Sequence, residues 1–289
     1  MLVASLLSSR AALPADDTKA GFVGCKTSIA YFPQHKVVLC TVPKASSSSW
    51  REFARRVHAV DHGKPSPNIW CGRSRLDFNG CLLDQPWAPP GVHSFDQLKN
   101  LVEKEHYTPA VFLRDPIERT LSAYTGTGHA HGPNPRQTTF AQFVNQLEQG
   151  VYNGNQHMAS QMKLCAFGRL RNESGIPWKF ASSAPRNSQN SGETTRRAQD
   201  FVSNLFGSEM MASIKYNWTQ CTGFSDDEFY SYNSTAREEV DLVTPELRKR
   251  IEALYSEDVE AYAESERQYR SAEIGSRLKA PSEPKALVP

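Results

Sequence analysis

The hydrophobic residues near the start of the chain form first a continuous run and then a helical pattern. Residues 37–42 are apolar and mostly β-branched, and the run has the length of a buried strand. The following apolar side chains lie three and four positions apart, at Trp50, Phe53, Ala54 and Val57. A proline, a lysine and four serines separate the two patterns. The pattern therefore predicts a strand at 36–42, a tight polar turn and a helix at 47–60.

A second strand follows a helix further along the chain. Ser94, with Gln97 three residues later, has the pattern of a capping box, and an apolar helical face follows it. Residues 108–113 form another short apolar run. A helix between two short buried strands is typical of a βαβ unit, in which the strands are parallel. We therefore expect an α/β fold with a parallel sheet flanked by helices.

The remaining patterns divide the rest of the chain. Asp115 and Pro116 are typical of an N-cap and a first helical residue. Further helices are predicted around 140–147, at 198–206 and after Thr244-Pro245, and a third strand at 216–224. Residues 181–197 are almost purely polar, which indicates a mobile surface loop. We expect a poorly ordered lead-in at 1–30, a single domain at 31–265 and a tail at 266–289.

Composition narrows the classes of function. The chain has 289 residues, with 33 Lys and Arg against 31 Asp and Glu. This balance argues against a general nucleic-acid binder, so any anion recognition must be local. No apolar run approaches the length of a membrane span, and the mildly apolar residues 1–7 lack a basic signal region. A membrane link is expected only through an N-terminal anchor that this sequence does not show.

The six cysteines do not indicate a metal site. None forms a Cys-x-x-Cys pair, and no ligand cluster is evident, so we expect no metal. Cys71 and Cys81 could close a short ring, whereas Cys40, inside the predicted strand, is interpreted as a buried thiol. Three glycosylation sequons, together with the cysteines, favour the secretory pathway. The sequons begin at Asn172, Asn217 and Asn233.

The first candidate site is the turn between the first strand and the first helix. A turn that opens a helix presents free backbone N–H groups and the positive end of the helix dipole. Here Lys44 and the hydroxyls of Ser46, Ser47, Ser48 and Ser49 are added, which favours a phosphate site. The turn is not a Walker A loop, because it has no glycine and its lysine precedes the hydroxyls. The alternative is a serine-rich loop that only caps a helix.

The second candidate site lies at the end of the second strand. Arg114 follows that strand just before a predicted helix start, and Ser122 comes two helical turns later. An arginine and a hydroxyl near a helix start can bind a phosphate with bidentate geometry. The alternative is an Arg–Asp capping pair on a surface helix.

Together the two motifs resemble the signature pair of the sulfotransferases that use 3′-phosphoadenosine 5′-phosphosulfate (PAPS). That family has a Pro-Lys-x-x-x-[Ser/Thr] loop after its first strand and an Arg-Asp-Pro-x-x-Arg-x-x-Ser-x-Tyr segment later. The resemblance implies the sulfotransferase fold, a P-loop-NTPase-like parallel sheet. It implies that Arg114 and Ser122 bind the 3′-phosphate, and that the first loop binds the 5′-phosphosulfate. The loop residues are Pro43, Lys44, Ala45, Ser46, Ser47, Ser48, Ser49 and Trp50.

Two more segments are similar to the Golgi carbohydrate sulfotransferases, which include chondroitin 4-O and uronyl 2-O enzymes. Residues 155–165 resemble their His-Trp-x-x-Gln-x-x-x-Cys region, with Met158 in place of the tryptophan, and residues 244–258 resemble their closing helix. The resemblance implies transfer of a sulfuryl group to a glycan hydroxyl in the Golgi lumen. Lys44 would act on the leaving phosphate, and His93, at an interval before Arg114 similar to the family's catalytic histidine, is the candidate base. His157 is the second candidate.

Two other functions remain open at this level. A nucleotide kinase shares the strand–loop–helix logic, but it needs a Walker lysine and a magnesium-binding acid, and neither is evident. A glycan- or partner-binding protein without turnover could also use this scaffold.

Overall fold

The fold is a mixed sheet of four strands with helices on both faces. The computed structural model describes residues 29–45, 47–63, 90–126, 138–185, 192–213 and 240–279; the side chains of 47–49, 51, 52, 126, 240 and 273–279 are not described. The described strands are β1 (Ile29–Phe32), β2 (Val37–Cys40), β3 (Thr108–Leu113) and β4 (Lys179–Ser182), in that order across the sheet. β1 runs antiparallel to β2, whereas β2, β3 and β4 are parallel.

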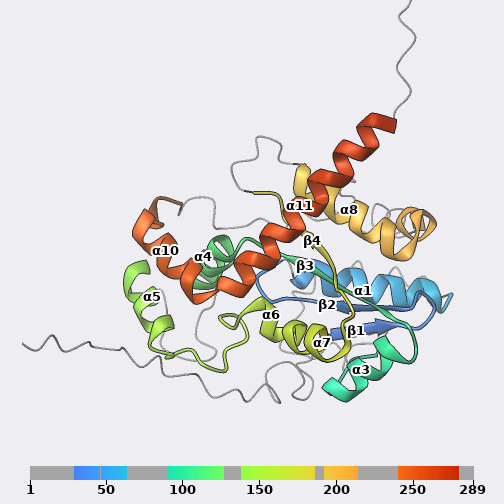
Figure 1. Ribbon diagram of the computed structural model, residues 1–289, viewed down its shortest axis with the longest axis horizontal. Coiled ribbons are helices and arrows are strands. Elements are labelled where there is room, and N and C mark those ends of the chain that lie inside the picture. The colour runs from blue at the N-terminus through green and yellow to red at the C-terminus, as the bar shows by residue number, and fades with distance from the viewer. Residues whose placement is uncertain are drawn as a thin grey trace, which may run out of the picture.

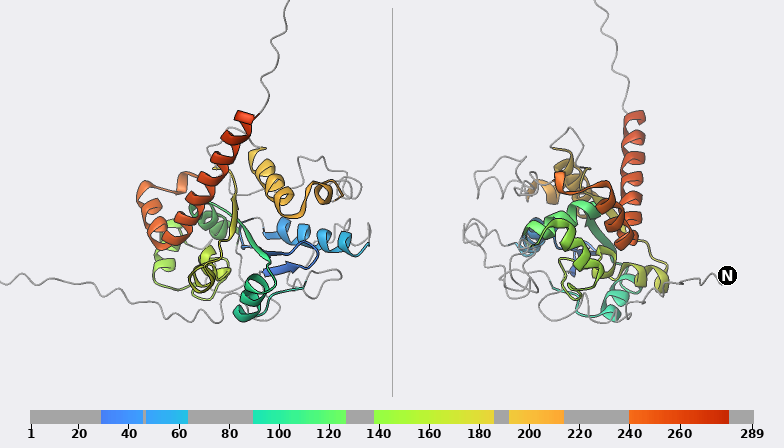
Figure 2. Two further views of the ribbon diagram at one scale, coloured as in Figure 1. Left: turned by 45° about the vertical axis from the view of Figure 1, so that its right-hand side comes forward. Right: turned by 90° about the vertical axis from the view of Figure 1, so that its left-hand side faces the viewer.

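Helices cover the two faces of this sheet (Figure 1, Figure 2). On one face lie α1 (Ser47–Asp61) and α8 (Glu193–Phe206). On the other lie α3 (Phe95–Glu103), α6 (Gln161–Leu164), α7 (Phe167–Ser174) and the first part of α11 (Ser256–Lys279). A third cluster joins α4 (Pro116–Gly126), α5 (Phe140–Glu148) and α10 (Pro245–Leu254), and the short η6 (Val240–Leu242) precedes α10.

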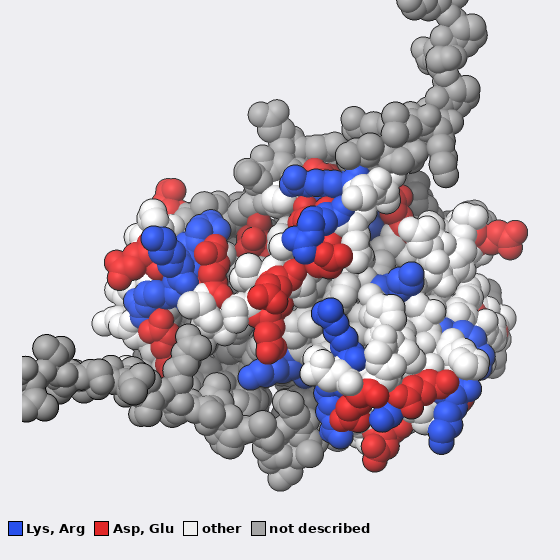
Figure 3. Space-filling view, in the orientation of Figure 1, with Lys and Arg blue, Asp and Glu red and all other residues white. Residues whose placement is uncertain are grey.

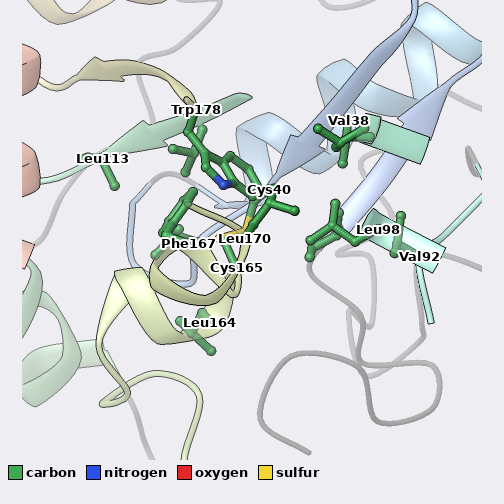
Figure 4. Close-up of a cluster of buried hydrophobic side chains, with 14 of the residues drawn as sticks. Val38, Cys40, Val92, Leu98, Leu113, Leu164, Cys165, Phe167, Leu170 and Trp178 are labelled. Carbon is green, nitrogen blue, oxygen red and sulfur yellow. A yellow bond between two sulfur atoms is a disulfide. The ribbon is translucent and has the colours of Figure 1, made fainter. Parts of the chain in front are cut away.

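The alternation of side chains along the strands explains this layering. Val37 and Leu39 pack with α1 and α8, whereas Val38 and Cys40 pack with α3, α6 and α7. All four residues are buried, because the parallel part of the sheet is covered on both faces. The close-up in Figure 4 shows the second of these packing layers, where Trp178 and Phe167 meet edge to face.

The helix starts follow the predicted cap chemistry. Ser94 accepts the N–H of Gln97 at the start of α3, and Gln97 in turn accepts the N–H of His93. Asp115 accepts two N–H groups in the first turn of α4. Thr244 caps α10, with Pro245 at the first helical position. These starts and the predicted strand at 108–113 are confirmed, as is the α/β class with a parallel sheet.

Several predicted boundaries differ from the structure. β1 begins at Ile29, inside the predicted lead-in, and β4 occupies 179–182, where no strand was expected. α8 begins at Glu193, so within the polar stretch at 181–197 residues 181–182 are strand and 193–197 are helix. α11 continues to Lys279, well into the predicted tail, and Glu266 is buried in the fold. The predicted strand at 216–224 lies outside the described residues.

The interpretation of Cys40 as a free thiol is wrong. Cys40 forms a disulfide with Cys165, and their Cα atoms lie 6.0 Å apart. A single strand pattern cannot reveal this pairing, because the partner is 125 residues away and only the folded chain brings it to β2. The ring predicted for Cys71 and Cys81 lies outside the described residues.

Candidate functional site

Two helix starts meet at the carboxyl edge of the parallel strands. β2 leads through residues 41–45 into α1, and β3 leads through Arg114 and Asp115 into α4. Because β2 and β3 are neighbouring parallel strands, both connections leave the sheet at the same edge. Ligands of open α/β sheets bind at this edge, and helix N-termini favour anions there.

The Lys44 turn is tight and joined to the second connection. Lys44 has a left-handed backbone with φ of 65°, and the N–H of Ala45 donates to the carbonyl of Val42 at 3.1 Å. Nη1 of Arg114 donates to the carbonyl oxygen of Lys44 at 3.1 Å. The two sequence motifs, 70 residues apart, are therefore in direct contact.

Arg114 is held on both sides by one glutamine. The backbone N–H of Arg114 donates to Oε1 of Gln161 at 3.1 Å, and its carbonyl accepts Nε2 of Gln161 at 2.9 Å. The Arg114 side chain also contacts Glu118, with Nε 3.4 Å from Oε2. Gln161 is fully buried. This pair of hydrogen bonds fixes the backbone from which the Arg114 side chain extends.

Arg119 is a buried cation that joins the Lys44 turn to residues 156–159. Its Nε donates to the carbonyl of Pro43 at 2.9 Å. Its Nη1 and Nη2 donate to the carbonyls of Ala159 and Gln156, at 2.7 and 3.2 Å. Among the residues that the structure describes, no carboxylate lies within ion-pair distance of Arg119.

Positive charge accumulates at this edge. The pKa of Lys44 is lowered from its ordinary value, mainly by burial and further by the nearby charges of Arg114 and Arg119. Burial also lowers the pKa of Arg119, although Asp258 acts in the opposite direction. No carboxylate in the described part of the chain pairs with the Lys44 ammonium. Such a group of cations is the electrostatic condition for binding an anion.

The other residues predicted for the first loop lie in different surroundings. Pro43 and Ala45 are buried in the turn, and Trp50 is 1% exposed in the core. The Trp50 ring packs against Phe112 and Phe201 with centroid distances of 5.0 and 5.8 Å. Its indole therefore serves packing. The side chains of the four serines at 46–49 lie outside the described part of the structure.

Ser122 lies half-buried on α4, and the hydroxyl of Thr125 donates to its carbonyl at 3.5 Å. Since Arg114 precedes the first turn of α4 and Ser122 follows in its second turn, both belong to the same helix start. Within the described residues no hydrogen bond joins the two side chains, so a shared ligand stays a prediction.

His93 lies at the same edge of the sheet, but to one side. Gly91 pairs with Ala30, and the N–H of Val92 donates to the carbonyl of Ile29 at 3.0 Å. This pairing sets residues 90–92 beside β1, two strand spacings or roughly 10 Å from β2. His93 follows directly and is exposed. The predicted position at the strand ends is therefore confirmed, and its catalytic role stays a prediction.

His157 lies within the network of Arg119. It stands between Gln156 and Ala159, whose carbonyls accept from Arg119, and its own N–H donates to Asn155. This backbone arrangement sets the segment around His157 near the Lys44 turn, and its role as second candidate base stays a prediction.

Asp258 anchors the same region from the C-terminal helix. Its carboxylate accepts the hydroxyl of Ser160 and the N–H groups of Gln161 and Met162, at 2.7 to 3.0 Å. Sequence reasoning assigned no role to Arg119, Gln161 or Asp258. The sequence did mark these residues, because all three lie in segments that carry the family resemblance. Their partners, however, are mostly backbone groups that only the fold brings close.

The described residues contain no group of three or more His, Cys, Asp or Glu side chains that could hold a metal ion. No helix among them is long and apolar enough to cross a membrane. On the face drawn in Figure 3, Lys and Arg side chains alternate with Asp and Glu rather than forming a patch of one sign. The candidate anion site is therefore defined by the local charges at Lys44, Arg114 and Arg119, not by a charged patch on this face.

Comparison with known proteins gives the family. The sequence model of the sulfotransferase family matches residues 27–263. Carbohydrate sulfotransferase 9 of Homo sapiens is 32% identical over 91 residues, which are 32% of this chain and 18% of that protein. The match thus spans less than a fifth of this curated relative, and no solved structure matches the chain. Because the family match includes the whole sheet and both helix starts at the site, this chain belongs to the sulfotransferase family.

Proposed function

We propose that this protein transfers a sulfuryl group from PAPS to a hydroxyl group of a carbohydrate. The observation that carries the proposal is the direct contact between the Lys44 turn and Arg114 at the carboxyl edge of the sheet. It brings two anion-binding motifs together in a chain of the sulfotransferase family. The similarity to a human carbohydrate sulfotransferase supports a glycan as the acceptor class.

The charges of the site fit a donor with two anionic ends. The 5′-phosphosulfate would bind at the Lys44 turn and the start of α1, and the 3′-phosphate at Arg114 and Ser122 on the start of α4. Arg114 retains capacity for this contact, because its Nη2 makes no hydrogen bond to a described residue. The lowered pKa of Lys44 also supports this fit, since a bound anion would relieve the repulsion from Arg114 and Arg119.

The chemistry is an in-line displacement at sulfur. The acceptor oxygen forms a bond to sulfur as the bond from sulfur to the phosphate oxygen breaks. A base removes the hydroxyl proton, and Lys44 offsets the negative charge that develops on the leaving oxygen. His93 is the first candidate for the base and His157 the second. The products are a sulfated glycan and adenosine 3′,5′-bisphosphate (PAP).

The Cys40–Cys165 disulfide supports an oxidising compartment, because such bonds persist mainly in secreted and lumenal proteins. The sequon at Asn172 lies on α7 with an exposed side chain. These features support the secretory pathway, and we propose the Golgi lumen as the location of the enzyme.

The direct test is transfer from radiolabelled PAPS to a panel of oligosaccharides with free hydroxyl groups. We expect label on one acceptor class, and none when adenosine 5′-phosphosulfate, which lacks the 3′-phosphate, replaces PAPS. Tight binding of PAP without transfer to any acceptor would instead identify a binding protein on this scaffold.

A further inference from the structure

We propose that Arg119 is a positioning residue for the anion site. By holding the Pro43 carbonyl against residues 156–159, it fixes the Lys44 turn relative to Arg114. This inference rests on the proposed function for its ligand, but its structural content can be tested without one.

The contacts of Arg119 reach two segments that are far apart in the sequence. One nitrogen binds the carbonyl just before Lys44, and the other two bind carbonyls on the 156–159 turn. A planar guanidinium holds the three acceptors with donors on three separate nitrogens in one plane, whereas the three donors of an ammonium share one nitrogen and point tetrahedrally. Arg119 therefore sets the distance between this turn and the Lys44 loop.

The 156–159 turn is itself fixed to the second motif. Gln161, just after the turn, binds the backbone of Arg114 on both sides. Asp258 holds the start of α6 at Gln161, and the hydroxyl of Tyr255 donates to the carbonyl of Met158 at 2.6 Å. The Lys44 turn and Arg114 are thus held against one common support.

Its burial also separates Arg119 from an ordinary ligand contact. The side chain is 2% exposed, and its three hydrogen bonds end on backbone carbonyls rather than on a carboxylate. A buried cation without an acidic partner is costly, whereas an apolar side chain would fill the same space at lower cost. What the guanidinium adds here is the connection between three backbone groups and a positive field next to Lys44.

The test compares Arg119→Lys with Arg250→Lys, which makes the same change at a partly exposed arginine that binds Glu148 on α5. Arg119→Lys keeps the charge and loses the planar three-point contact. We expect its Kd for PAP, measured by calorimetry on the full chain, and its KM for PAPS to rise about tenfold. The KM of Arg119→Lys for the acceptor should not change, and neither should the PAP affinity of Arg250→Lys. A lower kcat with unchanged KM and Kd would mean that Arg119 acts in the chemical step and not in placing the anion site, and would overturn the inference.

Amide exchange in the ligand-free protein separates this inference from the proposed function. In Arg119→Lys the N–H of Ala45, which binds the Val42 carbonyl, should exchange at least several-fold faster. Exchange at Val144 in α5 should stay the same. Equal protection of Ala45 in both proteins would overturn the positioning role, whereas failure of the wild-type protein to bind PAP would overturn the proposed function alone.

If Arg119→Lys does not fold, Tyr255→Phe provides the second variant. It removes only the hydroxyl that holds the Met158 carbonyl, between the two acceptors of Arg119. We expect a rise of a few-fold in the Kd for PAP and faster exchange at Ala45, because one support of the turn is lost. Unchanged values would contradict the proposed support.

Discussion

Lys44 carries two costs in the ligand-free protein, and an anion would offset one of them. Its left-handed backbone, with φ of 65°, costs about 1 kcal/mol for a residue with a side chain. Its pKa is lowered by burial and by two nearby arginines. A bound phosphosulfate would offset the second cost, because its negative charge balances the repulsion between Lys44 and the two arginines.

The first prediction concerns the pH dependence of PAP binding. The protonated Lys44 binds the anion, and the folded pKa lies below 10.5. Above about pH 7.5 the phosphates, with a pKa of about 6, are fully ionised, so affinity should be constant from there and fall as the pH rises through this lowered pKa. Lys44→Arg should bind with little pH dependence from pH 7.5 to 10, because arginine stays charged. The same fall in both proteins, measured by calorimetry, would exclude Lys44 as its source.

The folding stability of the ligand-free protein should depend on pH with the opposite sign, increasing as the pH rises. Between the lowered pKa of Lys44 and 10.5 the unfolded chain binds more protons than the folded one. Folding stability from this group therefore increases as the pH rises through that window and is lost as the pH falls through the folded pKa. Urea unfolding of wild type and Lys44→Met over this range tests it; Lys44→Met should lack this increase.

A third prediction assigns the general base. His93→Ala should lower kcat about 100-fold or more, as removal of a general base does, without changing the Kd for PAP. His62→Ala is the matched control, because His62 follows the opposite end of α1 and is exposed. Full turnover in His93→Ala together with a large loss in His157→Ala would assign the proton transfer to His157.

At the scale of single residues, the sequence indicates the side chains proposed to bind the ligand but not those that hold them in place. Lys44 and Arg114 stand at strand ends before helix starts, a pattern visible in the sequence. Arg119 and Gln161 bind backbone carbonyls and N–H groups of distant segments. Any residue can present a carbonyl, so no residue pattern marks such a partner before the chain is folded.

The Cys40–Cys165 disulfide links two elements that both support the site. Cys40 ends β2, three residues before Pro43, and Cys165 follows α6, whose first residue binds Arg114. The bond closes a loop of about 125 residues and joins the sheet to the packing layer that contains Leu170 and Trp178 (Figure 4). It therefore acts on stability and on the placement of both motifs.

The fourth prediction follows from the length of this loop. The double variant Cys40→Ala, Cys165→Ala should lose about 4–5 kcal/mol of unfolding free energy, because without the disulfide the unfolded chain gains the entropy that the closed loop had denied it. Urea unfolding of the oxidised wild type and the variant measures the difference. A loss below about 1 kcal/mol would show that the bond adds little to the fold.

The helices found from sequence differ from the strands that were missed. α3, α4 and α10 have cap residues in front of an apolar face, so local chemistry defines them. β4 reads Lys-Phe-Ala-Ser and has only one fully buried position, so neither alternation nor a long apolar run marks it. It is a strand because β3 offers an open edge, a property of the sheet rather than of the segment. β1 is an apolar run of four residues, the same length as β2, and the sequence prediction did not include it.

At the scale of the whole molecule, α11 closes the sheet against β4 and α8. Glu266 accepts the hydroxyl of Ser182 at 2.7 Å and forms a buried ion pair with Arg197, and Tyr262 donates to the carbonyl of Ser183 at 2.9 Å. The buried structure thus includes a residue beyond 265, where polar composition had indicated a tail. In the sequence, polar side chains that form buried pairs look the same as exposed ones until their partners are known.

The fifth prediction tests this connection. Glu266→Ala leaves Arg197 buried with one of its two acidic partners, Glu193, and should cost about 3 kcal/mol of unfolding free energy. Glu264→Ala, two residues earlier, removes an exposed pair with Arg267 and should cost less than about 1 kcal/mol. Chemical unfolding of the three proteins gives both values. Equal effects would show that α11 does not pack on α8 and β4 through Glu266.

The central claim is that the Lys44 turn and Arg114 bind the two ends of one nucleotide. Calorimetric titration of PAP into wild type, Lys44→Ala, Arg114→Ala and Arg250→Ala tests it most directly. We expect wild type and Arg250→Ala to bind PAP equally well, and the Lys44 and Arg114 variants to bind at least tenfold more weakly, as loss of a charge-assisted contact implies. Adenosine 5′-monophosphate should bind wild type and Arg114→Ala with similar, weaker affinity, because it lacks the 3′-phosphate. Undiminished PAP binding in both Lys44→Ala and Arg114→Ala would contradict the account.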